Sequence, residues 1–496
     1  MALASWLPLM VLASSLLPGL AIFTLREERR RLRTALNLGG AIVKVALVLQ
    51  LIAAAGDGVF HEFRLELAPG LTLLLFSDPL SLLFVLLSAI LWLATTLYAI
   101  GYLEGSPHRS RFFGFFSLCV SATTGIALSG NLFSFLIFYE LLTLTTYPLV
   151  VHRGTEAAFA AGRTYLAYTL GGGVALLAGV VWLHALAGPV EFVAAGSLYH
   201  LTAADHPALI AIFVLLVGGL GVKAALVPLH AWLPVAMVAP APVSALLHAV
   251  AVVKAGAFGI VRVVYDVYGV RLAGELGLLA PLAVLAAVTI VYGSLRALTQ
   301  DDLKKRLAFS TVSQVSYIAF GAALLGPVAT IGGLVHLVHQ GLMKITLFFC
   351  AGNLAETLGV HKVSELNGVG RRMPLTMAAF TVGALGMIGL PPLAGFLSKW
   401  YLGLGALEVG AHWALAVLMA SSLLNAAYFL PILYRAWFLP AEDRRYTAPR
   451  GLETDWRLLA PPLFTAAAVV AAGLAAGAPL SPLAWARLIM ELEYAR

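Results

Sequence analysis

The 496-residue sequence has few charged side chains and very little cysteine. Charged residues make up 11% of the chain, whereas soluble domains carry about 25%. The two cysteines, Cys119 and Cys350, form no CxxC pair and join no set at the spacing of zinc or iron–sulfur ligands. No glycine-rich phosphate loop follows a strand, and the GGG at 171–173 is expected in a helix, where it permits close helix packing. The sequence thus excludes a soluble nucleotide-binding or redox domain, and we expect no cofactor and no metal site.

Long apolar runs fill most of the chain instead. Hydrophobic residues make up 61%, and the mean hydropathy is +0.93. A spanning helix needs about 20 mostly apolar residues, and short polar breaks divide the sequence into many such runs. We therefore predict an all-α polytopic membrane protein of about 14 transmembrane helices. Their expected ranges are 4–24, 35–55, 76–100, 112–130, 131–151, 163–187, 208–232, 240–265, 275–297, 308–325, 328–354, 375–403, 411–438 and 458–478.

The formal net charge of +7 is distributed by topology and does not indicate nucleic-acid binding. Loops that follow odd-numbered helices hold most of the arginines and lysines, whereas even-numbered loops hold only Arg64, Arg262 and Arg271. This asymmetry predicts cytoplasmic odd loops and both termini on the outer side of a prokaryotic cell (inner) membrane. The first apolar run precedes its basic cluster REERRRLR, so we interpret it as a retained helix and not as a cleaved signal peptide.

Several ionisable side chains fall inside the expected spans. Five are lysines, and a central lysine costs about 2.5–3.5 kcal/mol on insertion scales. The set comprises Lys44, Glu140, Lys223, Lys254, His336, His339, Lys344 and Lys399. Four such lysines would together cost about as much as the 5–15 kcal/mol that stabilises a typical domain. They must therefore be paired, neutralised or hydrated, and this favours a role in transport.

Some of these side chains also have simpler interpretations. Lys44 is expected to snorkel or to lie at a misplaced boundary. Lys344 follows His336 by eight residues on one helical face, so a structural hydrogen bond explains it as well as a function does. A histidine in a membrane can simply bond a neighbouring carbonyl, which leaves His248 and His339 open.

Proton chemistry suits the remaining set best. Glu140, Lys223, Lys254 and Lys399 lie deep in their spans. Low dielectric favours the neutral form of a lysine, whereas a nearby carboxylate favours the ammonium, so moving Glu140 relative to Lys223 would switch a proton on or off. With water between them, Lys223, Lys254, His336 and Lys399 would then form a lateral relay.

Prolines interrupt two of the expected helices in related segments. LVPLHAWL at 226–233 and LPPLAGFL at 390–397 share the pattern L-x-P-L-x-x-aromatic-L. Their prolines include Pro228 and Pro234 in the first segment and Pro391 and Pro392 in the second. Matching interrupted segments in two halves of a chain indicate a transporter built from repeats, with ions handled at broken helices.

Five segments together resemble the antiporter-like membrane subunits of respiratory complex I, membrane-bound hydrogenases and Mrp-type sodium/proton antiporters. The segments are KAALVPLHAWLP, APAPVSALLHAVAVVKAGAFGIVR, DDLKKRLAFSTVSQVSYI, HLVHQGLMKITLFFCAGN and GLPPLAGFLSKW, and the likeness covers roughly residues 75–440. The resemblance implies fourteen helices, with two inverted five-helix repeats (helices 4–8 and 9–13) and broken helices 7 and 12. By the same resemblance, Glu140 and Lys223 match the ion pair of the family, Lys254 the central relay lysine, His336 the histidine of helix 11 and Lys399 the terminal lysine. His230, His248, His339 and Lys344 are further candidates for relay or gating.

The resemblance divides the chain and leaves its subtype open. It implies N-terminal helices 1–3 at 1–111, a first repeat at 112–270, a second at 271–440, and helix 14 with a tail at 441–496. Lysine at 399 fits the Mrp D type, the complex I N type and hydrogenase equivalents better than the M type. TVSQVSYI and KITLFFCAGN look most like Mrp D subunits and the related ion-translocating subunits of hydrogenase-like complexes. Two departures from the family pattern are Val235 after Pro234, where an acidic residue is common, and Gln340, where many members have histidine.

The first functional hypothesis is a proton-translocating subunit of an Mrp-like monovalent cation/proton antiporter that exports sodium or potassium. An alternative is the pump module of a complex I-like quinone reductase or a membrane-bound hydrogenase, without a catalytic site of its own. A further alternative is the membrane partner of an inorganic-carbon uptake complex. In each case we expect other membrane subunits, lipids and protons as partners, and no nucleic acid.

Overall fold

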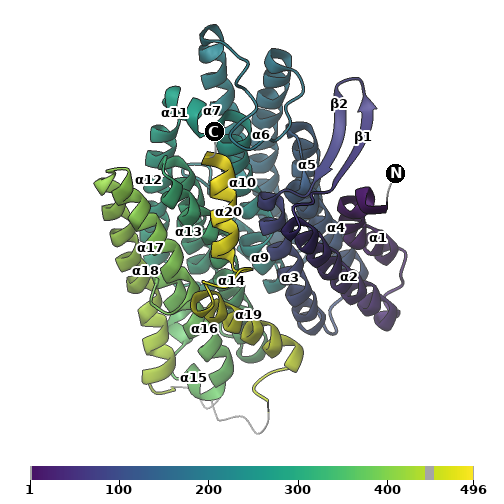
Figure 1. Ribbon diagram of the computed structural model, residues 1–496. Coiled ribbons are helices and arrows are strands. Elements are labelled where there is room, and N and C mark those ends of the chain that lie inside the picture. The colour runs from purple at the N-terminus through teal and green to yellow at the C-terminus, as the bar shows by residue number, and fades with distance from the viewer. Residues whose placement is uncertain (1–2, 442–451, 495–496) are drawn as a thin grey trace.

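The computed structural model describes residues 3–441 and 452–494, which form a bundle of long helices (Figure 1). Arg444, Arg445 and Arg450, which fall in the odd loop expected between helices 13 and 14, lie outside the described residues. The longer helices are α1 (Leu7–Phe23), α2 (Arg30–Gly56), α3 (Pro79–Tyr102), α4 (Arg109–Leu128), α5 (Leu132–Val150), α6 (Glu156–Ala187), α7 (His206–Lys223), α12 (Leu279–Leu298), α13 (Leu303–Ala323), α14 (Pro327–Leu358), α16 (Pro374–Ile388), α17 (Ala394–Glu408), α18 (His412–Phe438) and α19 (Trp456–Leu474). Shorter helices are α8 (Trp232–Val235), α9 (Ala241–Ala249), α10 (Val252–Arg262), α11 (Gly269–Glu275), α15 (Val369–Arg372) and α20 (Pro482–Tyr494).

The structure confirms a polytopic helical membrane protein. Within the described ranges, 11 helical segments are long and apolar enough to cross a membrane, and α1 and α16 are shorter apolar helices. Helices satisfy their backbone hydrogen bonds internally, which is what a bilayer requires. The total of fourteen spans and the pairing into two inverted repeats stay predictions.

One element of the fold was not predicted. Strands β1 (Glu62–Ala68) and β2 (Leu71–Phe76) pair antiparallel in a hairpin between α2 and α3. The tight connection turns at Gly70, which has a φ of +77° that favours glycine. In β1, the charged residues Glu62, Arg64 and Glu66 alternate with apolar residues, so the period-2 pattern of a strand was present in the sequence but lay in a segment assigned to a loop between spanning helices.

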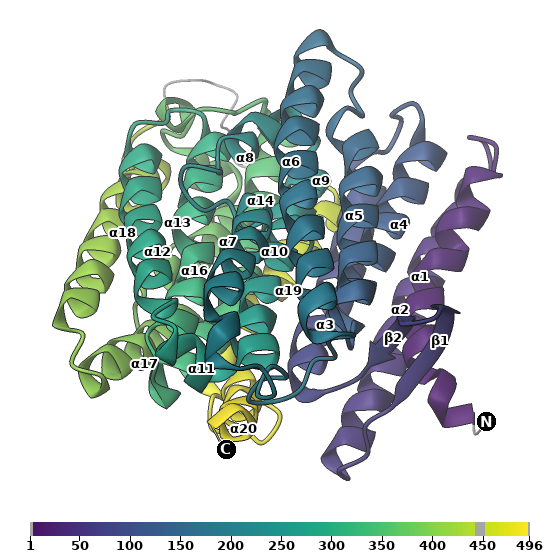
Figure 2. The same cartoon turned by 90° about the horizontal axis from the view of Figure 1, so that it is seen from above.

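Helix α14 runs through the middle of the bundle, where it packs against α9, α13, α16, α17 and α19 (Figures 1 and 2). Helices α1 and α2 lie at one edge, and α18 lies at the opposite edge. Both chain ends lie at the end of the bundle that carries α11 and α20, away from α15. Which end faces the cytoplasm stays a prediction from the arginine and lysine pattern.

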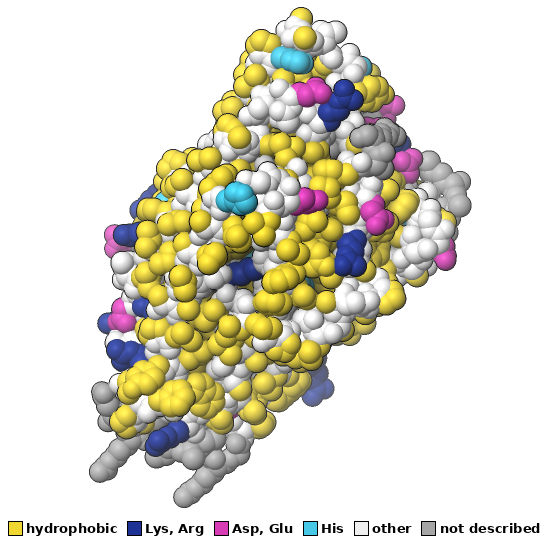
Figure 3. All heavy atoms as spheres, turned by 60° about the vertical axis from the view of Figure 1, so that its left-hand side comes forward, with side chains coloured by type: hydrophobic (Ala, Val, Ile, Leu, Met, Phe, Trp, Pro, Cys, Tyr) yellow, Lys and Arg dark blue, Asp and Glu magenta, His cyan; other side chains and the backbone are white. Residues whose placement is uncertain are grey.

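The outer surface of the bundle is broadly apolar. Figure 3 shows a face in which hydrophobic side chains dominate and charges are scattered. Exposed apolar side chains on α12 and α18 include Val284, Val288, Met419, Leu423 and Leu430. Such a surface suits lipid or a neighbouring membrane protein, because a soluble monomer rarely exposes so large an apolar area.

Arg262 corrects the count of loop charges. The sequence placed it in an outer loop, but it is buried at the end of α10 with 1% of its surface exposed. Its guanidinium donates to Asp78 at 2.7 and 2.8 Å and to Asp266 at 3.1 Å, and it lies over the rings of Phe192 and Phe258. Arg262 therefore ties α10 to the start of α3 as a paired buried charge.

Candidate functional site

The first proline segment interrupts its helix as predicted. Helix α7 ends at Lys223, residues 224–231 form turns around Pro228, and α8 begins at Trp232 and contains Pro234. The indole of Trp232 donates to the Val222 carbonyl at 2.7 Å, and the Ala225 amide donates to the same carbonyl at 3.1 Å, so a side chain and a turn together hold the end of α7. The break thus places the Lys223 amine at a helix end inside the bundle.

Lys223 is fully buried beside the helix that carries Glu140. Its Nζ donates to the carbonyl of Tyr139 on α5 and lies 3.3 Å from the centre of the Tyr139 ring. Glu140 follows in sequence and interacts electrostatically with Lys223, but the described residues include no Glu140–Lys223 salt bridge within 4.0 Å. Glu140 Oε1 is buried without a hydrogen-bond partner. The structure therefore places the two groups near each other, but they do not form the expected ion pair.

A glycine on α6 makes room for the Glu140 carboxylate. A Cβ at Gly173 would overlap Oε1 of Glu140, whereas a Cβ at Gly172 would press on Val222 and on the Gly219 carbonyl of α7. Nothing lies within 4 Å of a Cβ at Gly171. The glycine triplet thus permits close packing, as the sequence predicted, and one of its members contacts the candidate relay itself.

Lys254 lies just after a third helix break that the sequence did not reveal. Helix α9 ends at Ala249 and α10 starts at Val252, with no proline or glycine at 250–251 to mark the interruption. The fully buried Lys254 Nζ donates to the Leu337 carbonyl of α14 at 2.6 Å. Two residues further on, Gly256 packs against the backbone of Lys223 and Ala224. Lys254 therefore lies between the first broken helix and α14.

His336 sits between Lys254 and Lys399. It interacts electrostatically with both lysines, and its ring stacks on Tyr317 at 4.9 Å. Its Nδ1 is 2.8 Å from the hydroxyl of Ser398, the neighbour of Lys399 in sequence. The predicted order of Lys254, His336 and Lys399 is thus present in space.

Lys399 caps the second broken helix. Helix α16 ends at Ile388, and α17 starts at Ala394 after the segment with Pro391 and Pro392. Lys399 Nζ donates to the carbonyls of Met387 and Ile388, both at 2.9 Å, and to Ser422 Oγ at 3.0 Å. The carbonyls at the end of α16 therefore hold the ammonium, as the proline pattern predicted.

Lys344 belongs to a polar network that reaches the same helix end. Its Nζ donates to Ser310 Oγ at 2.6 Å, and Ser310 is 2.8 Å from the hydroxyl of Tyr428. Tyr428 donates to Asn425 at 2.5 Å, and Asn425 donates to the Met387 carbonyl at 3.0 Å. Met387 also accepts from Lys399, so the structure links the two lysines through hydrogen bonds.

The remaining candidates lie close to the breaks. The His230 ring, within the first break, meets the Tyr292 ring edge to face with 5.0 Å between the ring centres. His248, which packs on Phe348 at 4.5 Å, is fully buried just before the third break, and neither of its ring nitrogens has a hydrogen-bond partner. His339 is buried on α14, next to Gln340, whose amide also lacks partners. Unpaired buried polar atoms are costly, so this region suits bound water.

The departures from the family pattern have different surroundings. Val235 ends α8 with 41% of its surface exposed, whereas Gln340 is fully buried beside the relay. A polar group at Val235 would therefore reach solvent or a partner. One at Gln340 stays inside the bundle.

Lys44 is the clearest error of the sequence analysis. It does not snorkel, because it is fully buried in the middle of α2 and donates to Ser15 and Thr124. A partial signal was the polar face of α4, where Ser117, Ser121 and Thr124 follow one another at helical spacing.

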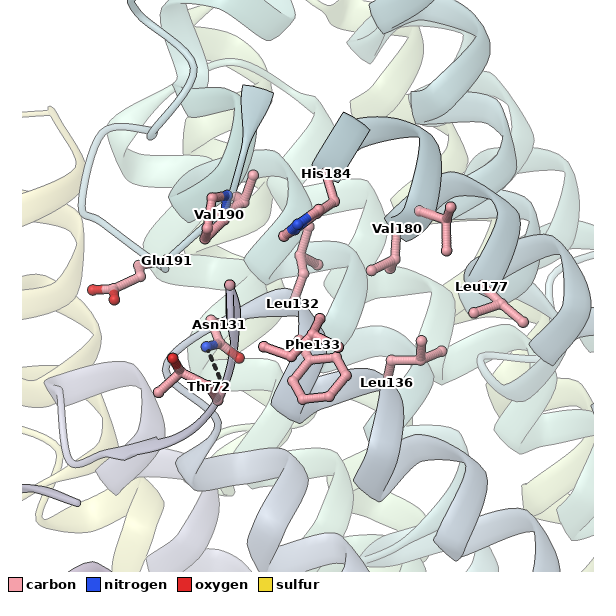
Figure 4. Close-up of a pocket in the computed structure, with 14 residues that line it drawn as sticks. Thr72, Asn131, Leu132, Phe133, Leu136, Leu177, Val180, His184, Val190 and Glu191 are labelled. Carbon is pink, nitrogen blue, oxygen red and sulfur yellow. Dashed lines mark hydrogen bonds between the residues drawn. The ribbon is translucent and has the colours of Figure 1, made fainter. Parts of the chain in front are cut away.

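In the described part of the chain, one hollow lies away from the relay and another reaches its terminal lysine. A cavity of about 270 Å³ between β2, α5 and α6 is lined by His184, Asn131 and several leucines and valines, and contains no candidate relay residue (Figure 4). An open groove of about 570 Å³ between α17 and α18 includes Lys399 and Ser422 among apolar side chains. The groove leads from the terminal lysine to the outside of the bundle.

Comparison with known proteins agrees with this arrangement. A family model described as "NADH:quinone oxidoreductase/Mrp antiporter, TM" matches residues 129–425, and one described as "NADH-Ubiquinone oxidoreductase (complex I), chain 5 N-terminus" matches 70–113. The chain is 39% identical over 410 residues to NADH-quinone oxidoreductase subunit N of Desulforudis audaxviator, covering 80% of this chain and 81% of that protein.

More distant relatives share part of their length or their fold. Identity is 33% over 368 residues to a component of a probable K(+)/H(+) antiporter of Rhizobium meliloti, covering 72% of this chain but 36% of that protein. A chain of the Mrp complex structure from Dietzia sp. shares the fold with a TM-score of 0.86 at 24% identity, covering 100% of this chain and 98% of that one. The chain therefore belongs to the NADH:quinone oxidoreductase/Mrp antiporter family of multi-pass membrane proteins.

Proposed function

We propose that this chain is a proton-translocating subunit of a multisubunit Mrp-like cation/proton antiporter. The observation that carries the proposal is a succession of ionisable groups with a lysine at each of the three described breaks: half-buried Glu140, then fully buried Lys223, Lys254 and His336, then half-buried Lys399. Buried ionisable groups in a membrane protein mark ion or proton pathways, because each is costly to retain.

The geometry supports a switch at the start of this path. Lys223 bonds the Tyr139 carbonyl, and the Glu140 carboxylate is unpaired at Oε1. A small rotation that closes the Glu140–Lys223 pair favours the ammonium, and reopening it favours release of the proton. The proton then passes through water from Lys223 to Lys254, His336 and Lys399.

Proton flux in inverted native-membrane vesicles tests this role. A pH gradient should collapse when sodium or potassium is added, and the response should be lost in Lys223→Ala and Glu140→Ala. An intact response in both variants would refute the relay. The matched control Lys305→Ala alters an exposed lysine at the start of α13 and should change nothing.

A second candidate is the pump module of a redox-driven complex. The specific observation in its favour is the 39% identity to a protein named as a quinone oxidoreductase subunit N. In that case the pH gradient should form only when an electron donor is supplied, and added cations should leave it unchanged. Mass spectrometry of the gently purified complex separates the two, since nickel or iron–sulfur subunits favour the redox assembly.

Lateral neighbours and orientation complete the proposal. The groove at Lys399 opens on the apolar side of α17 and α18, which suits contact with another membrane protein of the complex. The boundaries at 1–111, 112–270, 271–440 and 441–496, and the placement of both termini outside, remain part of this proposal.

A further inference from the structure

We propose that Lys44 is a second intramembrane proton site, reached along a seam of polar side chains between α1, α2 and α4. This seam lies outside the five-residue relay. Lys44, Ser15, Ser121 and Thr124 also lie outside both family matches, which cover 70–113 and 129–425. The proposal therefore goes beyond the function assigned above.

Lys44 has the surroundings of a group that exchanges its proton. It is fully buried, and its Nζ donates to Ser15 Oγ at 2.7 Å and to Thr124 Oγ1 at 2.6 Å. From α3, the ring of Trp92 lies 5.0 Å from Nζ. Among the described residues, none of the helices packed on Lys44 brings a carboxylate or a second cation to it. An unpaired ammonium in low dielectric is poorly stabilised, so the amine can give up its proton.

A purely structural role does not explain the choice of lysine. Serine or asparagine would join α1, α2 and α4 by the same hydrogen bonds without the cost of a buried amine, about 2.5–3.5 kcal/mol at the centre of a membrane helix. The hydroxyls of Ser15 and Thr124 accept from Lys44 and donate to the Leu12 and Val120 carbonyls at 3.3 and 2.8 Å, and a hydroxyl that rotates away from its carbonyl can donate to a neutral amine. The site therefore accommodates both protonation states.

The seam connects Lys44 to one end of the bundle. Ser121 Oγ donates to Ser15 Oγ at 2.8 Å and to the Ser117 carbonyl at 2.9 Å. Ser117 donates to the Asn37 side chain at 3.2 Å, and Asn37 donates to the Arg33 carbonyl at 3.0 Å.

Arg33 marks the far end of this seam. It donates to Ser110 at 2.8 Å and lies 3.9 Å from the half-exposed Glu27. At about 1.5 Å per residue, the seam follows roughly 16 Å of α2 from Arg33 to Lys44. The arginine and lysine pattern places the Glu27 end in the cytoplasm.

A second observation indicates that a hydrated species fits beside Lys44. Ser88, Trp92 and Thr96 follow one another by four residues on α3 and are fully buried. The Oγ of Ser88, the Nε1 of Trp92 and the Oγ1 of Thr96 each lack a hydrogen-bond partner. Such atoms are normally satisfied by protein or by bound water. Their common face meets Lys44 at Trp92.

The proton transfer needs one co-reactant, a hydronium ion that reaches Ser121. Ser121 takes a proton from this ion as it passes its own proton to Ser15, and Ser15 passes its own to neutral Lys44. Each hydroxyl ends neutral, a water molecule is left at Ser121, and the positive charge moves to Lys44 Nζ. Release reverses the same steps.

Lys44→Arg separates proton exchange from structural support. Arginine keeps a positive charge and several donors but is not deprotonated in proteins. Proton flux in native-membrane vesicles should fall by about tenfold in Lys44→Arg and in Lys44→Met. A proton-transferring group typically contributes about 10²–10⁴ in rate, and the expected loss is smaller here because the main relay persists. The thermal midpoint of the purified complex with Lys44→Arg should stay near that of the wild type. If flux in both variants stays within about twofold of the wild type, the proposal is overturned, because a lysine that only supports the structure does not change the barrier to proton transfer.

Seam variants cover the case in which Lys44→Arg does not assemble. Ser121→Ala should lower the flux, whereas the matched control Ser14→Ala should not, because Ser14 bonds only the Val11 carbonyl of its own helix. Equal flux in the two serine variants would count against the seam.

The pH dependence of the thermal midpoint distinguishes this proposal from the relay. It needs no transport, so it tests Lys44 even if wild-type vesicles show no flux and the proposed function fails. The difference in midpoint between wild type and Lys44→Met should change with pH if Lys44 titrates in the folded protein. A constant difference would show a lysine that never exchanges its proton.

Discussion

Three adjacent glycines on α6 give a matched series of alanine substitutions. At Gly173 the added methyl would overlap the Glu140 carboxylate, at Gly172 it would lie 2.9 Å from Val222, and at Gly171 it would meet nothing within 4 Å. Only Gly173→Ala therefore moves a relay group directly. We expect it to displace Glu140 from its position beside Lys223 and to reduce proton flux.

The magnitudes follow from helix propensity and packing. Alanine is favoured over glycine inside a helix by about 0.8–1.0 kcal/mol, and overpacking a filled site costs about 1–3 kcal/mol. Gly171→Ala should therefore be neutral or slightly stabilising, whereas Gly172→Ala and Gly173→Ala should lose about 0–2 kcal/mol. If moving Glu140 raises the barrier to proton transfer by about 1.4 kcal/mol, the flux falls about tenfold.

Two assays separate stability from function in this series. Thermal unfolding of the purified complex should rank Gly171→Ala first, and fluorescence-monitored pH gradients in vesicles should show a loss specific to Gly173→Ala. Equal flux in Gly173→Ala and Gly171→Ala at equal protein level would refute the role given to Glu140. Equal losses of proton flux in Gly172→Ala and Gly173→Ala would show that helix packing, and not the displacement of Glu140, causes the loss.

Three further predictions follow from other contacts. Ser398→Ala removes one hydrogen bond to His336 and should lower proton flux by about two- to tenfold. Ser398→Thr keeps the hydroxyl and should retain most of the flux. Arg262→Met leaves the carboxylate of Asp78 unpaired, and the loss of a buried partner should cost about 3–5 kcal/mol in thermal unfolding. Burial and the nearby acidic charges raise the pKa of Glu493 to about 9. Protonated Glu493 should therefore stabilise the docking of α20 fully below about pH 4, and this stabilisation should be lost as pH rises through 9. Hydrogen exchange of α20 in the wild type and in Glu493→Gln can measure the loss.

The membrane class and the two proline breaks could be predicted because their signals are local. Apolar runs of spanning length and prolines inside them are visible in single segments of sequence. The ionisable residues inside the spans could also be predicted, since a lysine such as Lys254 is easily identified within an apolar segment. Their order was proposed from the sequence, the family resemblance implied the same roles, and the structure places Lys254, His336 and Lys399 in that order.

Other features depend on contacts between distant segments. The break between α9 and α10 contains no proline, so only packing against α14 and α7 reveals it. Lys44 has hydroxyl partners 29 and 80 residues away, which no local pattern connects. Arg262 looked like a loop charge because its partner Asp78 is 184 residues distant in sequence.

The open state of the ion pair also lay beyond sequence reasoning. Glu140 and Lys223 were expected to pair, and the structure holds Lys223 on the Tyr139 carbonyl instead. The Tyr139 carbonyl competes with the Glu140 carboxylate for the same ammonium, and residue types alone do not tell which acceptor Lys223 bonds.

The most direct test of the relay is the proton flux of Lys254→Met in native-membrane vesicles. Lys254 is fully buried at the centre of the path, and a methionine of similar length removes its proton-binding group with little change in packing. We predict that the pH gradient response is abolished in Lys254→Met and unchanged in the exposed control Lys305→Met. Normal flux in a well-assembled Lys254→Met complex would contradict the account.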